Sequence, residues 1–393
     1  MSQAQLAGEG ISKPYMSRLE SGTRPPTERV VTYLAERLNV AKSELLHSEV
    51  LTLPEALAAV VSAADAEQAF ERLRATLRGE PDADPALRWQ ALWLLAEQQD
   101  GNELALLQEL TSLADEIDQP ALRAQARARL ARHLRAQGEL EQAHAAAQQA
   151  LEAVVGSLID PADTALILLA LVSIETETGR TREAEKHADQ LESLLPDLPR
   201  RIGIEALWTV AAQRIYQGRY PDGRVALEQA MHGLRSNEDL VLWMRLRLAA
   251  ARLHLMIEPQ DLQAAAQRLG EAEPAVRLIG RARHHQEFQT MRARLAFLRG
   301  DYAECQRLCE GIDPRAKHLD YRDRLRHQAL IAQLRIATGD STAAADLERL
   351  AQQARERGNF ELASEIWRAL AKSLEATVAP SAGQRPDSAA ELP

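Results

Sequence analysis

The chain has 393 residues, of which 46% are hydrophobic and 26% charged, and its formal net charge at pH 7 is −10. This length allows more than one folding unit with a substantial buried core. The acidic surplus argues against a protein that coats nucleic acid over its whole surface. Alanine and leucine dominate the hydrophobic residues, and aromatic residues make up only 4%. Because these two residues favour helices, whereas strands favour β-branched and aromatic residues, we predict an all-α fold.

The cysteines and the apolar runs indicate the compartment. Two cysteines, Cys305 and Cys309, are too few for a disulfide framework, which fits a reducing environment. The N-terminus lacks the charged and apolar pattern of a secretory signal. The longest apolar run, residues 165–172, is far shorter than the roughly 20 residues that span a bilayer. We therefore expect a soluble, cytoplasmic protein without a membrane segment.

Residues 1–47, here called the head, differ in charge from the rest of the chain. They carry six basic side chains against five glutamates, so the whole acidic surplus lies in the remaining residues. A weakly basic head on an acidic body suits local contact with DNA, because the body is repelled by the phosphate backbone.

Turn and cap residues divide the head into three helices. A short first helix ends at the glycine turn of residues 8–10, and Ser12 caps a second helix with Pro14 in its first turn. Gly22 ends this helix, and Thr27 caps a third. The third helix has an apolar stripe made of Val30, Val31, Leu34, Ala35 and Leu38.

The head contains the stretch ISKPYMSRLESG at residues 11–22, followed by LAERLNV at residues 34–40. Residues 2–46 resemble the helix-turn-helix of phage-repressor-like, xenobiotic-response-element-type regulators. They are especially similar to the variant that precedes tetratricopeptide arms in peptide-sensing bacterial regulators. The resemblance implies a homodimer that reads double-stranded DNA with the second helix of the head in the major groove.

The same resemblance implies the DNA contacts, residue by residue. At the start of the second helix, the positions expected to contact base edges are Lys13, Pro14, Ser17 and Arg18. The positions expected to contact the DNA backbone are Gln3, Tyr15, Thr23 and Arg24.

An alternative interpretation is a degenerate head that does not bind DNA. Domains of this family have a complete helix before the segment that begins here at Ser2, and its absence would expose Leu6, Leu19 and Leu34. We expect the true start to lie upstream, which would restore that helix.

Beyond the head, turns recur every 37 to 41 residues. They are centred on Gly101, Gly138, Gly179, Gly218, Pro259, Gly300 and Gly339. A small residue follows five positions after most of these glycines, as in Ala143, Ala184, Gly223 and Cys305. A glycine ends a helix cheaply, and a small residue lets two helices approach closely. The pattern predicts a series of helical hairpins in constant register.

Residues from about 85 to 375 resemble tetratricopeptide repeats, in a longer form of about 40 residues. The resemblance implies a superhelix of stacked hairpins that presents a concave groove to a peptide or protein. We expect a repeat domain at residues 54–377, with an additional hairpin at residues 54–78. Residues 47–53 separate it from the head, and residues 378–393 form a disordered tail.

The resemblance also indicates which residues of the first helix of each hairpin line the groove. These are Arg132, Arg135, Ser173, Thr176, Glu177, Trp208, Ile215, Tyr216, Arg247, Arg252, Arg294, Phe297 and Arg326. Arginines in a groove can bind carboxylates of a peptide. In the alternative interpretation, the arginines pair with the abundant acidic residues and the aromatic residues pack between repeats. The four asparagines fall outside these positions, which disfavours a peptide pheromone held by its backbone.

The remaining groups of cysteine and histidine residues are better explained by packing or solvent exposure than by a metal or catalytic site. Cys305 and Cys309 occupy small-residue packing positions, so we expect buried thiols and no metal site. The pair His284 and His285 is typical of a solvated helix surface. Phosphate-binding glycine loops, zinc spacings and nucleophile elbows are absent from the sequence, so we expect neither an enzyme nor a cofactor.

Two functions are consistent with these features. The first is a sequence-specific transcription regulator whose repeat arm senses a peptide, protein or small ligand and mediates dimerisation. The second is a repeat scaffold for protein interaction with a head that does not bind DNA.

Overall fold

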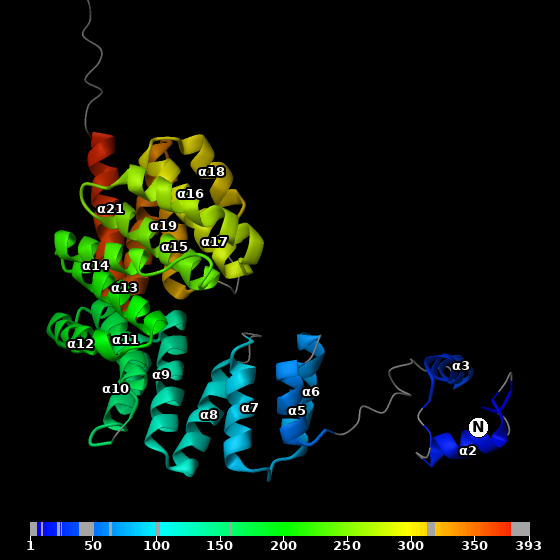
Figure 1. Ribbon diagram of the computed structural model, residues 1–393. Helices are drawn as coiled ribbons and strands as arrows, with labels where there is room; N and C mark the ends of the chain where they lie inside the picture. The colour runs from blue at the N-terminus through cyan, green and yellow to red at the C-terminus, as the bar shows by residue number, and fades with distance from the viewer. Residues whose placement is uncertain are drawn as a thin grey trace, which may run out of the picture. The chain divides into compact units, whose positions relative to one another are not determined.

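The computed structural model describes residues 6–8, 11–21, 24, 26–38, 51–62, 65–98, 103–157, 159–312 and 319–378. Every regular element in these ranges is a helix, which confirms the predicted all-α fold (Figure 1). Contacts divide the chain into two units, Met1–Gln98 and Gln99–Pro393, and the second is called the repeat unit here. The expected boundary at residues 47–53 lies partly outside the described ranges and stays a prediction.

The first unit begins with two short helices, α2 (Lys13–Glu20) and α3 (Glu28–Leu38). Helix α2 begins where it was predicted, because the Ser12 hydroxyl accepts a hydrogen bond from the backbone N–H of Tyr15 at 3.3 Å. A small apolar core contains Leu6, Ile11, Met16 and Val30. The expectation that Leu6 would be exposed is wrong, since these core residues bury it, whereas Leu19 and Leu34 are half-buried.

Three further helices complete the described part of this unit, namely α5 (Leu53–Ser62), α6 (Ala66–Gly79) and α7 (Pro85–Ala96). The Asp65 carboxylate caps α6 and the Asp84 carboxylate caps α7. Helices α5 and α6 pack on each other and on α7. The hairpin predicted at residues 54–78 is therefore confirmed.

The repeat unit consists of successive helical hairpins joined by short turns. Their helices are α8 (Glu103–Ile117), α9 (Pro120–Gln137), α10 (Leu140–Glu152), α11 (Pro161–Glu177), α12 (Thr181–Leu194), α13 (Arg200–Tyr216), α14 (Tyr220–His232), α15 (Leu240–Met256), α16 (Leu262–Ile279), α17 (Ala282–Leu298), α18 (Tyr302–Glu310), α19 (Tyr321–Ala337), α20 (Ala344–Glu356) and α21 (Phe360–Val378). No helix in the described part of the chain is both long and apolar enough to cross a membrane.

The predicted turns and packing positions match the structure. Positive φ angles occur at the predicted turn glycines 138, 179, 218, 300 and 339, and also at residue 358. The turn predicted at Gly101 lies outside the described residues. Five residues after the turn at 218, a Cβ on Gly223 would lie 2.5 Å from the Cγ1 atom of Ile215. The close approach of two helices therefore explains the small residue at this position.

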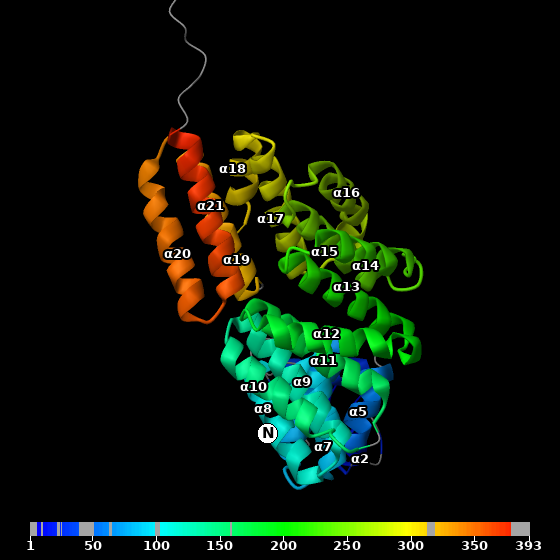
Figure 2. The ribbon, with the colours of Figure 1, turned by 90° about the vertical axis from the view of Figure 1, so that its left-hand side faces the viewer.

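The last hairpins of the repeat unit return to its first ones. Helix α19 contacts α9, and α21 contacts α11, as the adjacent ends of these helices in Figure 2 show. Arg357 lies 5.1 Å from the ring centre of Tyr321 and bonds the Glu139 carboxylate at 2.8 Å. At the same junction, Gly138 has a φ of +82°, and a Cβ on it would lie 2.6 Å from the Tyr321 ring. The junction therefore depends on a glycine for two separate reasons.

We predict that Gly138→Ala destabilises the protein more than Gly300→Ala. Both glycines have positive φ, so alanine costs about 1–2 kcal/mol of backbone strain at either position. Only at Gly138 does the added methyl group also displace the Tyr321 ring, which costs about 1–3 kcal/mol more, whereas no atom lies within 4 Å of it at Gly300. Urea unfolding measures both free energies. Equal losses in the two variants would contradict the close junction.

Candidate binding cavity of the repeat unit

The inner surface of the repeat unit forms an open cavity of about 820 Å³. Its walls come mainly from the first helices of successive hairpins, α13, α15, α17 and α19, together with α21. This volume is in the range of small-molecule and peptide pockets. The cavity forms because the hairpins stack in a curve and their inner helices face one another across it.

One part of the wall is apolar. It contains the side chains of Leu255, Met256, Met291, Phe297, Leu298, Leu330 and Ile366. Two aromatic residues of the lining are unusually exposed for their size, Tyr302 at 38% and Phe360 at 49%. An exposed apolar wall inside a concave surface marks a ligand-binding groove.

The other part of the wall consists of ion pairs. The Arg252 guanidinium lies between Asp323 at 2.7 Å and Glu287 at 2.8 Å. Arg326 donates to both carboxylate oxygens of Glu365, to Oε1 at 3.2 Å and to Oε2 at 2.8 Å. Burial raises the pKa of Glu287, and the Arg252 charge offsets only part of that effect. These charges are therefore held in fixed geometry before any ligand binds.

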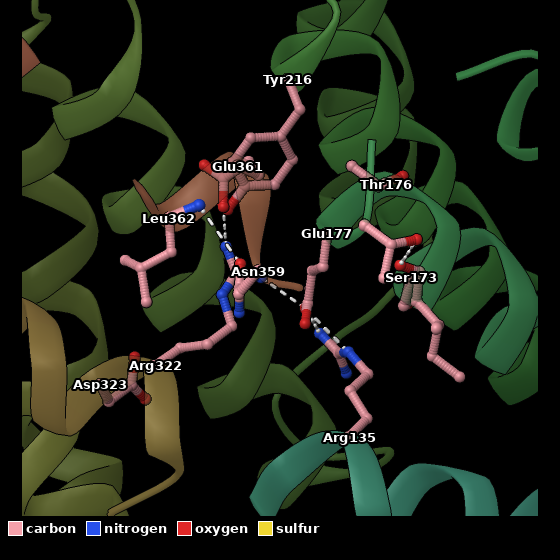
Figure 3. A network of polar contacts seen from close by, with 12 residues as sticks. Arg135, Ser173, Thr176, Glu177, Tyr216, Arg322, Asp323, Asn359, Glu361 and Leu362 are labelled. Atoms are coloured by element: carbon pink, nitrogen blue, oxygen red, sulfur yellow. Dashed lines mark hydrogen bonds and ion pairs between the residues drawn. The ribbon is translucent and has the colours of Figure 1, made fainter. Parts of the chain in front are cut away.

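A second set of ion pairs closes the superhelix at the edge of the cavity. Arg322 of α19 bonds Glu177 of α11 and Glu361 of α21, and Arg135 of α9 bonds Glu177 at 2.6 Å (Figure 3). We call these four residues the closing network. Tyr216 lines the cavity, and its ring centre lies 5.7 Å from the Arg322 guanidinium carbon. The network thus joins four helices that are distant in sequence.

Burial and the neighbouring charges shift the pKa of Glu177 in opposite directions. Its side chain is 2% exposed, and burial alone would raise the pKa of the carboxyl group. The Arg135 and Arg322 guanidinium groups outweigh burial, so the pKa of Glu177 lies below its ordinary value of 4.5. The carboxylate is therefore ionised and paired at neutral pH.

The structure brings some of the predicted groove residues to the cavity. Thr176, Tyr216 and Arg294 line it, and so do Ile215, Arg252, Phe297 and Arg326. These positions come from the inner helices of successive hairpins, as the repeat spacing predicted. The arginines at 252 and 326 are already paired with carboxylates, so the alternative interpretation holds for them.

The other predicted groove residues lie outside the cavity lining. Arg135 belongs to the closing network, because the returning helices α19 and α21 cover this part of the inner surface. Arg247 contacts Glu271 of α16 at 3.6 Å, and its guanidinium lies 4.1 Å from the ring centre of Trp243, one turn earlier on α15. Trp208 packs against an apolar cluster. Three more predicted groove residues lie outside the cavity lining, namely Arg132, Ser173 and Glu177.

Several cavity residues on α21 were missed by the sequence interpretation. Glu361, Glu365, Arg368 and Lys372 all line the cavity, yet no hairpin position was assigned after Gly339. The signal was present, because residues 358–363 read GNFELA and repeat the glycine with a small residue five positions later.

The prediction that both cysteines are buried thiols is confirmed, and the prediction that both histidines are exposed is wrong for His284. Cys305 and Cys309 are buried free thiols. His285 is exposed, but His284 is buried at the start of α17, where its Nδ1 atom accepts from the Arg281 N–H at 3.2 Å. Among the described residues, no group of three or more His, Cys, Asp or Glu could hold a metal ion.

The predicted DNA-contacting residues of the head lie on α2 or beside it. The four expected base-contacting side chains, Lys13, Pro14, Ser17 and Arg18, are all exposed. Tyr15 is half-buried and lies 5.1 Å from the Arg24 guanidinium. The remaining two expected contacts, Gln3 and Thr23, lie outside the described residues.

The fold and the cavity define an all-α helical-repeat protein. No family model matches the sequence, and no curated protein matches it. Among solved structures, a Rap protein complexed with competence and sporulation factor is 12% identical, with a TM-score of 0.53 over 82% of this chain and 96% of that one. At this identity the likeness shows the fold alone.

Two further solved structures are similar at lower TM-scores. A tetratricopeptide repeat protein from Parabacteroides merdae is 19% identical, with a TM-score of 0.40 over 77% of this chain and 99% of that chain. Aspartyl phosphate phosphatase F from Bacillus subtilis is 12% identical, with a TM-score of 0.47 over 92% of this chain and 89% of that chain.

We predict that Glu177→Gln destabilises the protein by about 3 kcal/mol at pH 7, because it removes a carboxylate partner of the buried Arg322 guanidinium and of Arg135. The pKa of Glu177 is lowered in the folded state, so the stabilisation is complete above 4.5 and is lost as the pH falls through the folded-state value. The difference from wild type in urea unfolding should therefore shrink below pH 4.5.

The matched control is Glu141→Gln, which removes an ion pair with Arg180 from a side chain that is 67% exposed. We expect it to cost less than about 1 kcal/mol. A loss in Glu177→Gln that equals this control, or that does not change with pH, would contradict the role of the closing network.

Proposed function

We propose that the repeat unit is a binding module that takes a short peptide, free or as a segment of a partner protein, into its cavity. The observation that carries the proposal is the combination of an exposed apolar wall with fixed charges in one concave cavity. A peptide presents both kinds of surface along its length, and preorganised polar groups fix its orientation.

The charges of the lining indicate the class of ligand. Five acidic residues and five basic residues line the cavity, so its formal charge is balanced. A nucleic acid would require a basic groove that neutralises phosphates. A peptide needs only local complementarity, which ion pairs and exposed aromatic residues supply. The Rap protein of similar fold, complexed with competence and sporulation factor, supports binding by this architecture.

The test of this proposal is affinity selection from a pool of synthetic hexapeptides, with bound peptides identified by mass spectrometry. We expect the full chain to retain a subset of the pool. Ser364→Trp should abolish retention, because the Ser364 side chain is exposed and lines the cavity.

The matched control for blocking the cavity is Ser112→Trp. Ser112 is an exposed residue of α8 whose hydroxyl donates to a carbonyl four residues earlier, as that of Ser364 does. This variant should retain the same peptides as wild type. Failure of wild type to retain any peptide, or equal retention by Ser364→Trp, would refute binding in the cavity.

A second candidate function is sequence-specific DNA binding by the head, with the repeat unit as its sensor and dimerisation arm. The observation that favours it is the exposure of Lys13, Ser17 and Arg18 on one short helix capped by Ser12. Lysine and arginine suit the acceptors of guanine in the major groove.

For this candidate we predict that Arg18→Ala relaxes the base preference in duplexes selected from random DNA, with a loss of about 1–3 kcal/mol at the contacted pair. Arg78→Ala on α6 is the matched control, because both arginines donate from Nε to a carbonyl four residues earlier. Mobility shifts at fixed salt measure both variants. If no duplex is selected, or both variants bind as wild type does, the head does not read DNA in this way.

A further inference from the structure

One half-buried arginine of the cavity, Arg294, lacks the carboxylate partner that Arg252 and Arg326 have. Arg252, Arg326 and Lys372 each contact an acidic side chain within 3 Å, and Arg368 is exposed on α21. Arg294 is half-buried, and within the described residues its side chain bonds only a neutral group, the Gln333 carbonyl oxygen, at 2.5 Å.

Enclosure of this guanidinium without an anion is energetically unfavourable. Taking a charge out of water costs several kcal/mol unless a partner compensates it. Burial accordingly lowers the pKa of Arg294. The acidic residue with the strongest opposing effect on the pKa of Arg294 is Glu365, and its carboxylate already binds Arg326 through both oxygens. A ligand that brings a carboxylate would supply the missing charge.

Gln333 adds a second hydrogen-bond donor group to the site. Its side chain is 5% exposed, and its carbonyl oxygen must face Arg294 because a guanidinium only donates. The amide NH₂ of Gln333 is therefore available as a further donor beside the remaining N–H groups of Arg294. Both residues line the cavity, from neighbouring helices α17 and α19.

An apolar shelf lies next to these donors. The Phe297 ring centre is 5.7 Å from the Arg294 guanidinium and 5.6 Å from the Tyr302 ring centre. Leu298 and Leu330 also line the cavity. An anionic group at Arg294 would therefore be flanked by space for an apolar side chain.

We propose that Arg294 and Gln333 bind a carboxylate of the peptide, with a neighbouring apolar side chain of the peptide on Phe297 and Tyr302. This inference rests on the proposed peptide-binding function. The carboxylate comes either from the C-terminus of the peptide or from an aspartate or glutamate side chain, since both present the same two oxygens.

Three hexapeptide pools distinguish the two sources of the carboxylate: one with free C-termini, one amidated, and one with free C-termini but without aspartate and glutamate. Loss of binding on amidation assigns the C-terminal carboxylate. Loss of binding in the pool without acidic side chains assigns a side-chain carboxylate. If amidated peptides without any acidic residue bind as well as their free acids, the inference is wrong although the proposed function stands.

Two variants test the residues themselves by titration calorimetry with peptides that wild type retains. Arg294→Met should weaken binding about ten- to hundredfold, the value of a charge-assisted hydrogen bond. Gln333→Glu should weaken it similarly while raising the melting temperature, because the new carboxylate pairs with Arg294 and competes with the ligand. The second variant keeps the test valid if the first one folds poorly.

The matched control is Arg277→Met on α16, where the arginine side chain is 76% exposed and does not line the cavity. It should bind as wild type does. Unchanged affinity in Arg294→Met and Gln333→Glu would overturn the inference while peptide binding remains established. Failure of wild type to retain any peptide would overturn both the inference and the proposed function.

Discussion

The structure of the repeat unit depends on Arg322, whose guanidinium is buried between Glu177 and Glu361. Arg322 and Glu177 are 145 residues apart, and their pairing joins the last hairpins to the first ones. Two enclosed carboxylates and one enclosed guanidinium tolerate little displacement, because any unpaired member would be a buried charge. A stacked series of hairpins that touch only their neighbours is thereby converted into a closed superhelix.

Closure explains where the cavity lies. The returning helices α19 and α21 cover the inner surface of α9 and α11, so the early repeats contribute Arg135 to the closing network instead of to a ligand site. The inner helices of the later repeats line the cavity, together with α21. The charges that line the cavity are mostly neutralised by one another, which makes the donors of Arg294 and Gln333 distinct in chemistry.

The sequence predicted the turn and packing residues that repeat from one hairpin to the next. It did not predict the contacts between hairpins that are distant in the chain. Glycines with positive φ and small residues such as Gly223 repeat at a fixed spacing, so the hairpins followed from local rules. The resemblance to tetratricopeptide repeats then indicated the cavity positions of Tyr216 and Arg294. The pairing of Arg322 with Glu177 leaves no periodic trace, because it depends on the accumulated curvature of several repeats. For the same reason Arg135 was predicted to line the groove. In the structure it pairs with Glu177, which is buried where the last hairpins contact the first ones.

The closed superhelix is tested most directly by the distance between the turn after α9 and the turn before α21. Spin labels on the exposed residues Gln137 and Glu356 report it, because the Arg357 guanidinium lies 3.4 Å from the Gln137 carbonyl oxygen. For the otherwise unchanged chain we predict a short, narrow distance distribution by pulsed electron paramagnetic resonance, and in Arg322→Met a longer and broader one. A long, broad distribution without that substitution would contradict closure.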